Sequence, residues 1–483
     1  RFTVLALDAL VLLPAVCRLA RALGAAPSAA PSSPGEPPTP SLGLNTRVAC
    51  ALFQPALILV DHGHFQYNGV SLGLALGACA ALLERKDLLA SALFCLSLNF
   101  KQMSLYYAPV FFCHLLVRCL ARPGLVGTVV RLGQVGAVVV ATFALLWAPF
   151  AIWRAEGVTA LGALGQVLTR LFPFGRGLFE DKVANVWYVL SVLKKDLRGL
   201  DPGALKVVSL GATLLLLAPV CFDLLTRTKA ADQKHEHERL PLALGNSGLA
   251  FFLCSFQVHE KSFLLPLLPL VMLFPEDPLI IAWLSSVAAF SMFPLLVRDG
   301  LLVPYAVTQL VLVGLVASPY LPPTPDAEKL YEETRGWPFG GAKVPPEMHR
   351  IRREAKAKEV VRSQIAGASV LGMLLLHALE RLYRGASPFE RYPDLWPALF
   401  SLFSAAHFAA AYVYFTVWQL GIVPRQQAEG ETERLLVERS QLLEEQKRLM
   451  DEHKQLRLES ETGGGEPFPT SGPTRKKPRG KEE

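Results

Sequence analysis

Long apolar runs follow one another from Phe2 to Val423, and short polar loops separate most of them. Hydrophobic residues make up 52% of the 483 residues, and soluble domains do not combine such a content with repeated unbroken apolar runs. A helix that crosses a bilayer needs about 20 apolar residues, because it must satisfy its own backbone hydrogen bonds there. The pattern therefore predicts an all-α polytopic membrane protein, with about thirteen transmembrane helices in this chain.

Composition divides the chain into a membrane region and a tail. We expect residues 1–424 to form the membrane region, with a disordered Pro- and Ser-rich loop at 26–41. Within this region, 154–206 is expected to form a long loop whose first part is a helix lying at the membrane interface. The tail, 425–483, carries a short heptad pattern of Leu435, Leu442, Leu449 and Leu456. This pattern fits either self-association through 435–456 or a solvated amphipathic helix, followed by a disordered basic end.

The charged loops predict which side of the membrane each loop occupies. Alternating crossings place most loop Lys and Arg residues, and the tail, on one side, which the positive-inside rule makes cytosolic. The other side then receives four polar clusters, at residues 61–68, 99–104, 170–187 and 259–262. Because this convergence is independent of the count of crossings, it predicts that the four clusters form one site.

Residues 61–68 form a polar island between the apolar runs Val48–Val60 and Gly69–Leu83. All of its residues except Gly63 can form side-chain hydrogen bonds or stack on a sugar. Polar groups at an apolar boundary are costly without partners, so this dense cluster favours a functional site. The alternative is an interfacial belt, in which Tyr and His side chains anchor two helix ends. A lone Asp8 lies in the first apolar run, and we expect it to pair inside the bundle.

The residue types in the four clusters fit a phosphorylated lipid together with a glycan. Arg binds phosphate through two parallel hydrogen bonds, and Lys binds it as a point charge. We expect cationic residues of the non-cytosolic face to hold the phosphate of this lipid. These are Arg176, Lys182, His259, Lys261 and Lys101. Other polar and aromatic residues would shape the site and contact the substrates. These are Asp61, His62, His64, Gln66, Tyr67, Asn68, Gln102, Glu180, Asp181, Asn185, Trp187 and Glu260.

Two other functions compete with this one. Asp61, His62, His64 and His259 are possible metal ligands, but their spacing is not that of a zinc site, and we predict no metal. A transporter or flippase of lipid-linked sugars would need a polar path at mid-membrane, with charges inside the spans. Here the clusters lie at the ends of spans, which favours an enzyme at the membrane face. We predict no nucleic-acid partner.

Three stretches resemble the signatures of the endoplasmic-reticulum glucosyltransferases that use dolichyl-phosphate glucose. They are Asp61–Asn68, Arg170–Trp187 and Phe256–Ser262. Gly63, and Gly177–Asn185 within the second stretch, are more similar to the member that adds the first glucose than to the member that acts next. The resemblance implies a GT-C fold in the endoplasmic-reticulum membrane, with a lumenal active site and a cytosolic tail.

The resemblance also implies a reaction. It is the inverting, metal-independent transfer of glucose from dolichyl-phosphate glucose to a terminal mannose of a dolichyl-pyrophosphate-linked high-mannose oligosaccharide, through an α-1,3 linkage, in N-glycosylation. Membrane lipids are expected as further partners, and no cofactor is expected besides the lipid-linked donor. In the family the general base is an Asp in the first lumenal loop, and no residue here matches it. We assign that role to neither Asp61 nor Asp181, and we expect the chain to be truncated at its N-terminus and inactive by itself.

Overall fold

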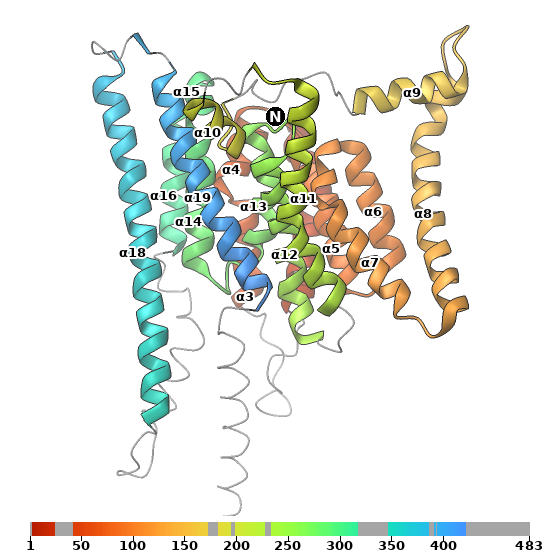
Figure 1. Cartoon of the computed structure of the whole chain (residues 1–483), viewed down its shortest axis with the longest axis horizontal. Helices are drawn as coiled ribbons and strands as arrows, with labels where there is room; N and C mark the ends of the chain where they lie inside the picture. Colours follow the sequence, from red (N-terminus) through yellow and green to blue (C-terminus); the bar gives the residue numbers. More distant parts are fainter. Residues whose placement is uncertain are drawn as a thin grey trace, which may run out of the picture. The chain divides into compact units, whose positions relative to one another are not determined.

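The computed structural model describes residues 2–24, 42–171, 182–194, 199–227, 233–316, 346–385, 391–392 and 394–421. The chain divides into two compact units, Arg1–Ile422 and Val423–Glu483, and the described residues belong to the first. The predicted loop 26–41 and the tail 425–483 lie outside the described residues, as do Arg176, Glu180 and Asp181. In the described ranges every regular element is a helix or a helical turn (Figure 1).

The helical elements of the first unit follow one another along the chain and fall into two groups. The first group is α1 (Phe2–Leu7), η1 (Asp8–Leu12), α2 (Leu13–Gly24), α3 (Leu42–Leu52), α4 (Pro55–Leu57), η2 (Ile58–Gly63), α5 (Asn68–Leu83), α6 (Asp87–Phe100), η3 (Gln102–Tyr107), α7 (Ala108–Leu120), α8 (Gly124–Ile152) and α9 (Ala160–Leu171). The second group is α10 (Val186–Leu193), α11 (Pro202–Arg227), α12 (Gln233–Cys254), η5 (Glu260–Phe263), α13 (Leu264–Val271), α14 (Pro278–Ser291), α15 (Phe293–Arg298), α16 (Leu302–Val316), α18 (Pro346–Tyr383) and α19 (Leu395–Gln419).

Among the described residues, six helical segments are long and apolar enough to cross a membrane. They are Phe2–Gly24, Gln102–Leu120, Gly124–Ile152, Pro202–Arg227, Val360–Tyr383 and Leu395–Gln419. Shorter apolar helices of 10–17 residues lie at Asn68–Leu83, Asp87–Phe100, Pro278–Ser291 and Leu302–Gly314. These segments confirm a helical, multi-pass membrane protein, whereas the GT-C fold and the count of about thirteen crossings stay predictions.

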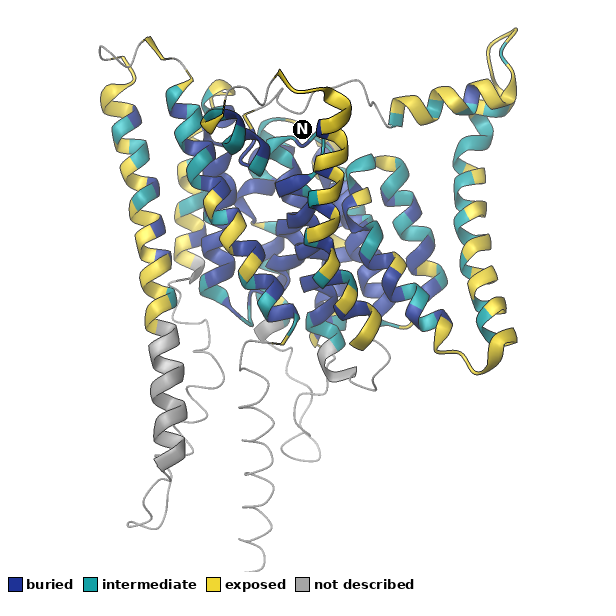
Figure 2. Cartoon of the chain, viewed as in Figure 1, coloured by how far each residue is buried: buried dark blue, intermediate teal, exposed yellow. Residues whose placement is uncertain are grey.

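The core of the unit surrounds α13. All eight residues of α13 are buried, and the densest burial in Figure 2 lies in the middle of the bundle. A helix that is apolar on every face lies either in lipid or among other elements, and α13 packs against α12, α14 and α5. At the periphery, α8 has no buried residue, and α9 runs across one end of it (Figure 1). Helix α9 occupies most of the range predicted to lie at the interface, and that location stays a prediction.

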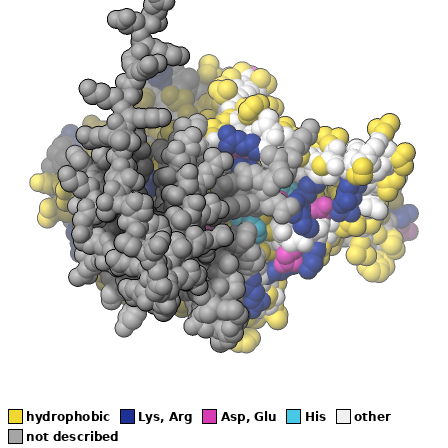
Figure 3. Space-filling model, turned by 90° about the horizontal axis from the view of Figure 1, so that it is seen from below, with side chains coloured by type: hydrophobic (Ala, Val, Ile, Leu, Met, Phe, Trp, Pro, Cys, Tyr) yellow, Lys and Arg dark blue, Asp and Glu magenta, His cyan; other side chains and the backbone are white. Residues whose placement is uncertain are grey.

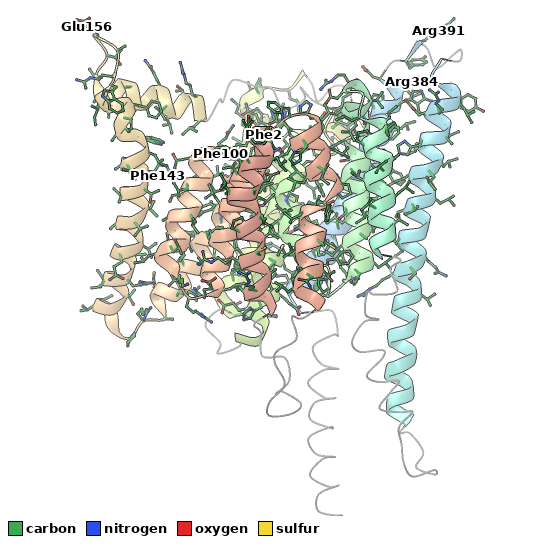
Figure 4. The ribbon with its side chains drawn as sticks, turned by 180° about the vertical axis from the view of Figure 1, so that it is seen from behind. Phe2, Phe100, Phe143, Glu156, Arg384 and Arg391 are labelled. Atoms are coloured by element: carbon green, nitrogen blue, oxygen red, sulfur yellow. The ribbon has the colours of Figure 1, made fainter. Side chains whose placement is uncertain are left out.

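The two ends of the bundle carry different polar groups. The end that is lowermost in Figure 1, which we call the lower end, is seen in Figure 3, where basic and acidic side chains lie near one another. At the opposite, upper end, Figure 4 labels Phe2, Phe100, Glu156, Arg384 and Arg391. Helices that follow one another in the chain run between these two ends, as the alternation of charged loops predicts.

Ion pairs at the lower end join four helices. Arg118 of α7 contacts Asp87 at the start of α6, and it lies 2.8 Å from Glu236 of α12. Arg131 of α8 reaches Asp87 at 2.9 Å, and His114 of α7 lies 3.2 Å from Glu236. Burial raises the pKa of Glu236, but the hydrogen bond from His114 and the charge of Arg118 outweigh it and lower the pKa to about 2. The charged form of Glu236 is therefore the form that stabilises the fold.

We expect the folded protein to lose stability as the pH falls from about 4.5 towards 2. A carboxyl whose pKa is lower in the folded chain than in the unfolded chain stabilises the fold above its ordinary pKa of 4.5, and this contribution disappears as the pH approaches about 2. Glu236→Gln should lower the melting temperature at pH 7, because Arg118 loses a charged partner. The stability of this variant should also fall less steeply than that of the wild type as the pH decreases. Thermal unfolding in detergent at several pH values measures both effects. A variant curve parallel to that of the wild type would contradict this assignment.

Helix α5 and the first membrane segment approach closely at Gly73. A Cβ at Gly73 would lie 2.9 Å from the backbone of Leu12, whereas a Cβ at Gly77 would meet no atom nearer than 3.7 Å. Only a glycine therefore lets η1 and α5 pack at this distance. This contact holds η1, which begins at Asp8, against the helix that begins at Asn68.

Gly73→Ala is expected to destabilise the fold by about 1–3 kcal/mol, because the backbone of η1 must move to admit the methyl group. Gly77→Ala is the matched control on the same helix. Its methyl group makes only ordinary contacts, so its unfolding temperature should equal or exceed that of the wild type. Thermal unfolding of both purified variants is the measurement, and equal losses at the two positions would refute the close approach at Gly73.

Candidate active site

Two wide helical turns place two carboxylates near one another. Both η1 and η2 are π-helical, and they carry Asp8 and Asp61 respectively. Such turns insert an extra residue into a helix and are frequent at functional sites. His62 Nε2 lies 2.8 Å from Asp8 Oδ2, so the lone charge of the first segment has a partner across the bundle. The expectation that Asp8 is paired inside the bundle is therefore confirmed.

Asp61 lies at the N-terminus of α5, and its side chain is completely buried. Its two carboxylate oxygens accept hydrogen bonds of 2.6 Å from the Asn68 side-chain amide and from the Gly69 backbone N–H. The first N–H groups of a helix have no partner within the helix, and the helix dipole favours a negative charge there. Asp61 thus satisfies the start of α5 from the preceding turn.

Lys101 connects the polar island to the hinge between α6 and η3. Its ammonium group donates to Asn68 Oδ1 and, at 3.2 Å, to Gln66 Oε1. Burial lowers the pKa of Lys101; the charge of Asp61 opposes this shift, and the charge of Lys261 adds to it. The last effect places the ammonium groups of Lys101 and Lys261 within electrostatic range. The polar island, the hinge and the 259–262 cluster therefore meet, as the sequence predicts.

The 259–262 cluster begins the short helix η5. The backbone N–H of His259 donates to Ser262 Oγ at 3.2 Å, which closes the turn that carries Lys261. The Ser262 hydroxyl of η5 interacts with the Tyr106 hydroxyl of η3. The ring of Tyr106 in turn stacks on Phe251 of α12, with ring centroids 4.8 Å apart. These contacts fix η5 against η3, next to Lys101.

Other predicted site residues have contacts that hold the scaffold. Asn185 accepts a hydrogen bond of 2.9 Å from the backbone N–H of Tyr188 and so caps α10. Trp187 Nε1 donates to the Cys254 carbonyl at 2.8 Å, which ties α10 to the end of α12. Lys182 is paired with Asp394 at the start of α19. The predicted contacts of these three residues with substrate stay predictions.

Two further residues of the polar island bind neighbouring elements. His64 Nδ1 lies 2.5 Å from Asp299, which follows α15, and the Tyr67 hydroxyl lies 2.9 Å from that of Thr3. The roles predicted for the remaining site residues, His259, Gln102 and Glu260, stay predictions. Among the residues that the structure describes, no group of three or more His, Cys, Asp or Glu side chains is arranged to hold a metal ion.

Three residues contribute to the site although they are not among the predicted site residues. Asp8, Asp299 and Tyr106 each contact a predicted site residue or its segment. Asp8 offered a signal, since a charge inside an apolar helix is a functional hypothesis by default. Asp299 and Tyr106 offered none, because their contacts depend on how distant helices pack.

The structure thus defines a helical membrane protein with a buried carboxylate, polar amides and two neighbouring lysines at one end of the bundle. Residues 1–415 match the model described as the ALG6, ALG8 glycosyltransferase family. The chain therefore belongs to this glycosyltransferase family, as its resemblance to dolichyl-phosphate-glucose-dependent enzymes predicts.

Curated relatives support the same assignment. The chain is 39% identical to the dolichyl pyrophosphate Man9GlcNAc2 alpha-1,3-glucosyltransferase of Gallus gallus over 369 residues, which cover 76% of this chain and 68% of that protein. It is 36% identical to the protein of the same name from Mus musculus over 369 residues, with the same coverage. It is 35% identical to that of Saccharomyces cerevisiae over 413 residues, which cover 83% of this chain and 68% of the yeast protein.

Asn68→Ala tests whether the polar island is a site or an interfacial belt. The variant removes the group that joins Asp61 to Lys101, so we expect sugar transfer by the full-length protein to fall at least about tenfold. Asn246→Ala is the control, because Asn246 is also a buried asparagine but bonds to Gln419 instead. Transfer and melting temperature are measured for both variants. Unchanged values for Asn68→Ala would favour the belt.

Proposed function

We propose that the full-length protein catalyses the transfer of glucose from dolichyl-phosphate glucose to a terminal mannose of a dolichyl-pyrophosphate-linked high-mannose oligosaccharide, as the first, α-1,3-linked glucose of N-glycosylation. Membership of the glycosyltransferase family and the names of the relatives support the reaction and the acceptor. The observation that carries the donor assignment is the half-buried ammonium group of Lys101, which is held by Asn68 and Gln66 of the polar island and interacts electrostatically with Lys261.

The finer assignments belong to the same proposal. The bundle is a GT-C fold of about thirteen crossings in the endoplasmic-reticulum membrane, and its upper end faces the lumen. The positive-inside rule supports this orientation, because Arg85, Arg118 and Arg131 lie at the lower end, which then faces the cytosol. The lipid tails of both substrates stay in the membrane, and their sugars and phosphates reach the upper end.

The proposed reaction is an inverting displacement at the anomeric carbon of glucose. A bond forms between the acceptor hydroxyl oxygen and the anomeric carbon, and the bond from that carbon to the phosphate oxygen breaks. The hydroxyl proton passes to a base, and dolichyl phosphate leaves with one more negative charge than it carries in the donor. Lysines placed at this phosphate stabilise the transition state more than the ground state, because the charge develops during the reaction.

Two described carboxylates near Lys101 already have partners. Asp61 accepts hydrogen bonds from Asn68 and Gly69, and Asp8 is paired with His62. We therefore assign the general base to neither of them. Their place in the proposed mechanism is to organise the start of α5 and the cations beside it.

The direct test supplies the full-length protein in proteoliposomes with dolichyl-phosphate glucose carrying labelled glucose and with the lipid-linked Man9GlcNAc2 acceptor. We expect a product one hexose heavier, with the label in an α-1,3 linkage. A flippase of lipid-linked sugars would move labelled lipid across the bilayer without forming this product. That outcome would overturn the proposed function.

Lys101→Met and Lys261→Met test the donor assignment. Each variant should lower the rate of glucose transfer at least about tenfold, because a charge-assisted contact to the leaving phosphate is lost. Lys194→Met is the control, since Lys194 is an exposed lysine that follows α10. Initial rates at saturating acceptor are the measurement. Rates equal to that of Lys194→Met would exclude these two lysines from the donor site.

A further inference from the structure

Asp61 is a buried carboxylate that the proposed reaction does not use directly. It is 0% exposed, and in the described part of the chain it is connected to Lys101 through the side chain of Asn68. We propose that Asp61 is a positioning residue, which uses the Asn68 amide to aim the Lys101 ammonium group at the donor phosphate, opposite Lys261. The proposal deepens the proposed function and rests on it.

The chemistry of the three groups permits a single arrangement of the amide. A carboxylate accepts hydrogen bonds and an ammonium group donates them, whereas an amide has one donor end and one acceptor end. Asp61 therefore takes the NH₂ end of Asn68, at 2.6 Å, and the carbonyl end turns to Lys101. A flipped amide would set its oxygen against the carboxylate and its NH₂ group against the ammonium. Asp61 thus determines which end of Asn68 the lysine meets.

Contact through an amide leaves the charge of Lys101 available to a ligand. An ammonium group has three donors, and the neutral carbonyl oxygens of Asn68 and Gln66 occupy two of them. A carboxylate in direct contact would neutralise the lysine and compete with phosphate. Because the Asn68 side chain lies between Asp61 and Lys101, the ammonium group keeps one hydrogen-bond donor and most of its charge for the leaving phosphate.

A second carboxylate, that of Asp8, lies beside Gly69 as Asp61 does. A Cβ on Gly69 would lie 2.2 Å from Asp8 Oδ1 and 3.4 Å from Asp61 Oδ2, so the start of α5 fits between the two carboxylates. His62 pairs with Asp8, and the Gly69 N–H donates to Asp61. The two acids therefore have separate partners, and Asp61 keeps its bond to Asn68.

The same geometry makes the activity depend on pH through Lys101. The charged groups that face Lys101 are Asp61 from η2 and Lys261 from η5, while Gln66 and Asn68 do not titrate. Burial lowers the pKa of Lys101, Asp61 raises it and Lys261 lowers it. Removal of the charge at Asp61 therefore lowers this pKa further. Because phosphate binding needs the protonated lysine, the alkaline limb of the pH–rate profile would move to lower pH.

The test compares Asp61→Asn with the wild type in proteoliposomes that contain the full-length protein. The KM for dolichyl-phosphate glucose should rise about tenfold or more, the KM for the oligosaccharide should stay unchanged, and the alkaline limb should move to lower pH. The double variant Asp61→Asn, Asn68→Asp returns a carboxylate to Lys101, and it should move the alkaline limb back to higher pH. Asp223→Asn is the control, because Asp223 is equally buried but bonds to Gln419, and it should change neither quantity.

Several results would overturn the proposal. A folded Asp61→Asn protein with wild-type donor KM and pH profile excludes a positioning role. An equal rise of both KM values shows a general structural role instead. If Asp61→Asn does not fold, Asn68→Ser gives the same readouts, because serine is too short to reach Lys101, and wild-type values again exclude the role. Absence of transfer by the wild-type protein counts against the proposed function, which separates the two failures.

Discussion

A negative charge buried at the start of a helix organises the upper end of the bundle. Asp61 has no exposed surface, so its charge is tolerated only with hydrogen-bond donors, and it finds them in Asn68 and the first free N–H of α5. Those two bonds fix the connection between η2 and α5. The segment in between then carries Gln66 and Asn68 to Lys101, and the close packing at Gly73 brings the turn that begins at Asp8 alongside.

The ion-pair network at the lower end and Lys101 at the upper end use charge in opposite ways. At the lower end, Arg118 and Arg131 contact the carboxylates of Asp87 and Glu236 directly, and the network joins four helices. Direct pairing of opposite charges holds helices together but leaves little charge for a ligand. At the upper end, Lys101 meets neutral carbonyl oxygens and lies within range of a second lysine. Two like charges held close together are unfavourable unless an anion joins them, so the upper end suits a phosphate.

Sequence patterns predicted the helical class and the meeting of the polar island, the hinge at Lys101 and the 259–262 cluster, because charged loops fix which end of each helix faces which side. The patterns did not predict the partner of Asp8, since its contact with His62 depends on two π-helical turns that displace residues from regular helical spacing. They also did not predict that Lys182 pairs with Asp394, far away in the chain. The number of crossings remained open because α5, α6 and α14, at 16, 14 and 14 residues, are shorter than an independent span.

Two of the three described non-glycine residues with positive φ lie in or beside the clusters predicted to form the site, and the third, Arg85, lies in the turn between α5 and α6. Phe65 and Gln257 have φ values of 69° and 63°, a conformation that side-chain-bearing residues rarely adopt. One lies in the polar island and the other immediately precedes Val258 and His259. Such strain persists only where surrounding contacts determine the conformation, and it is concentrated at functional sites. Here the surrounding contacts are those of Asp61 and Tyr106, which hold one turn with Asn68 and another with Lys261. Strain at both turns fits a scaffold that holds Lys101 and Lys261 in place before any phosphate binds. The folded structure then balances the repulsion between the two lysines, and a bound phosphate reduces it.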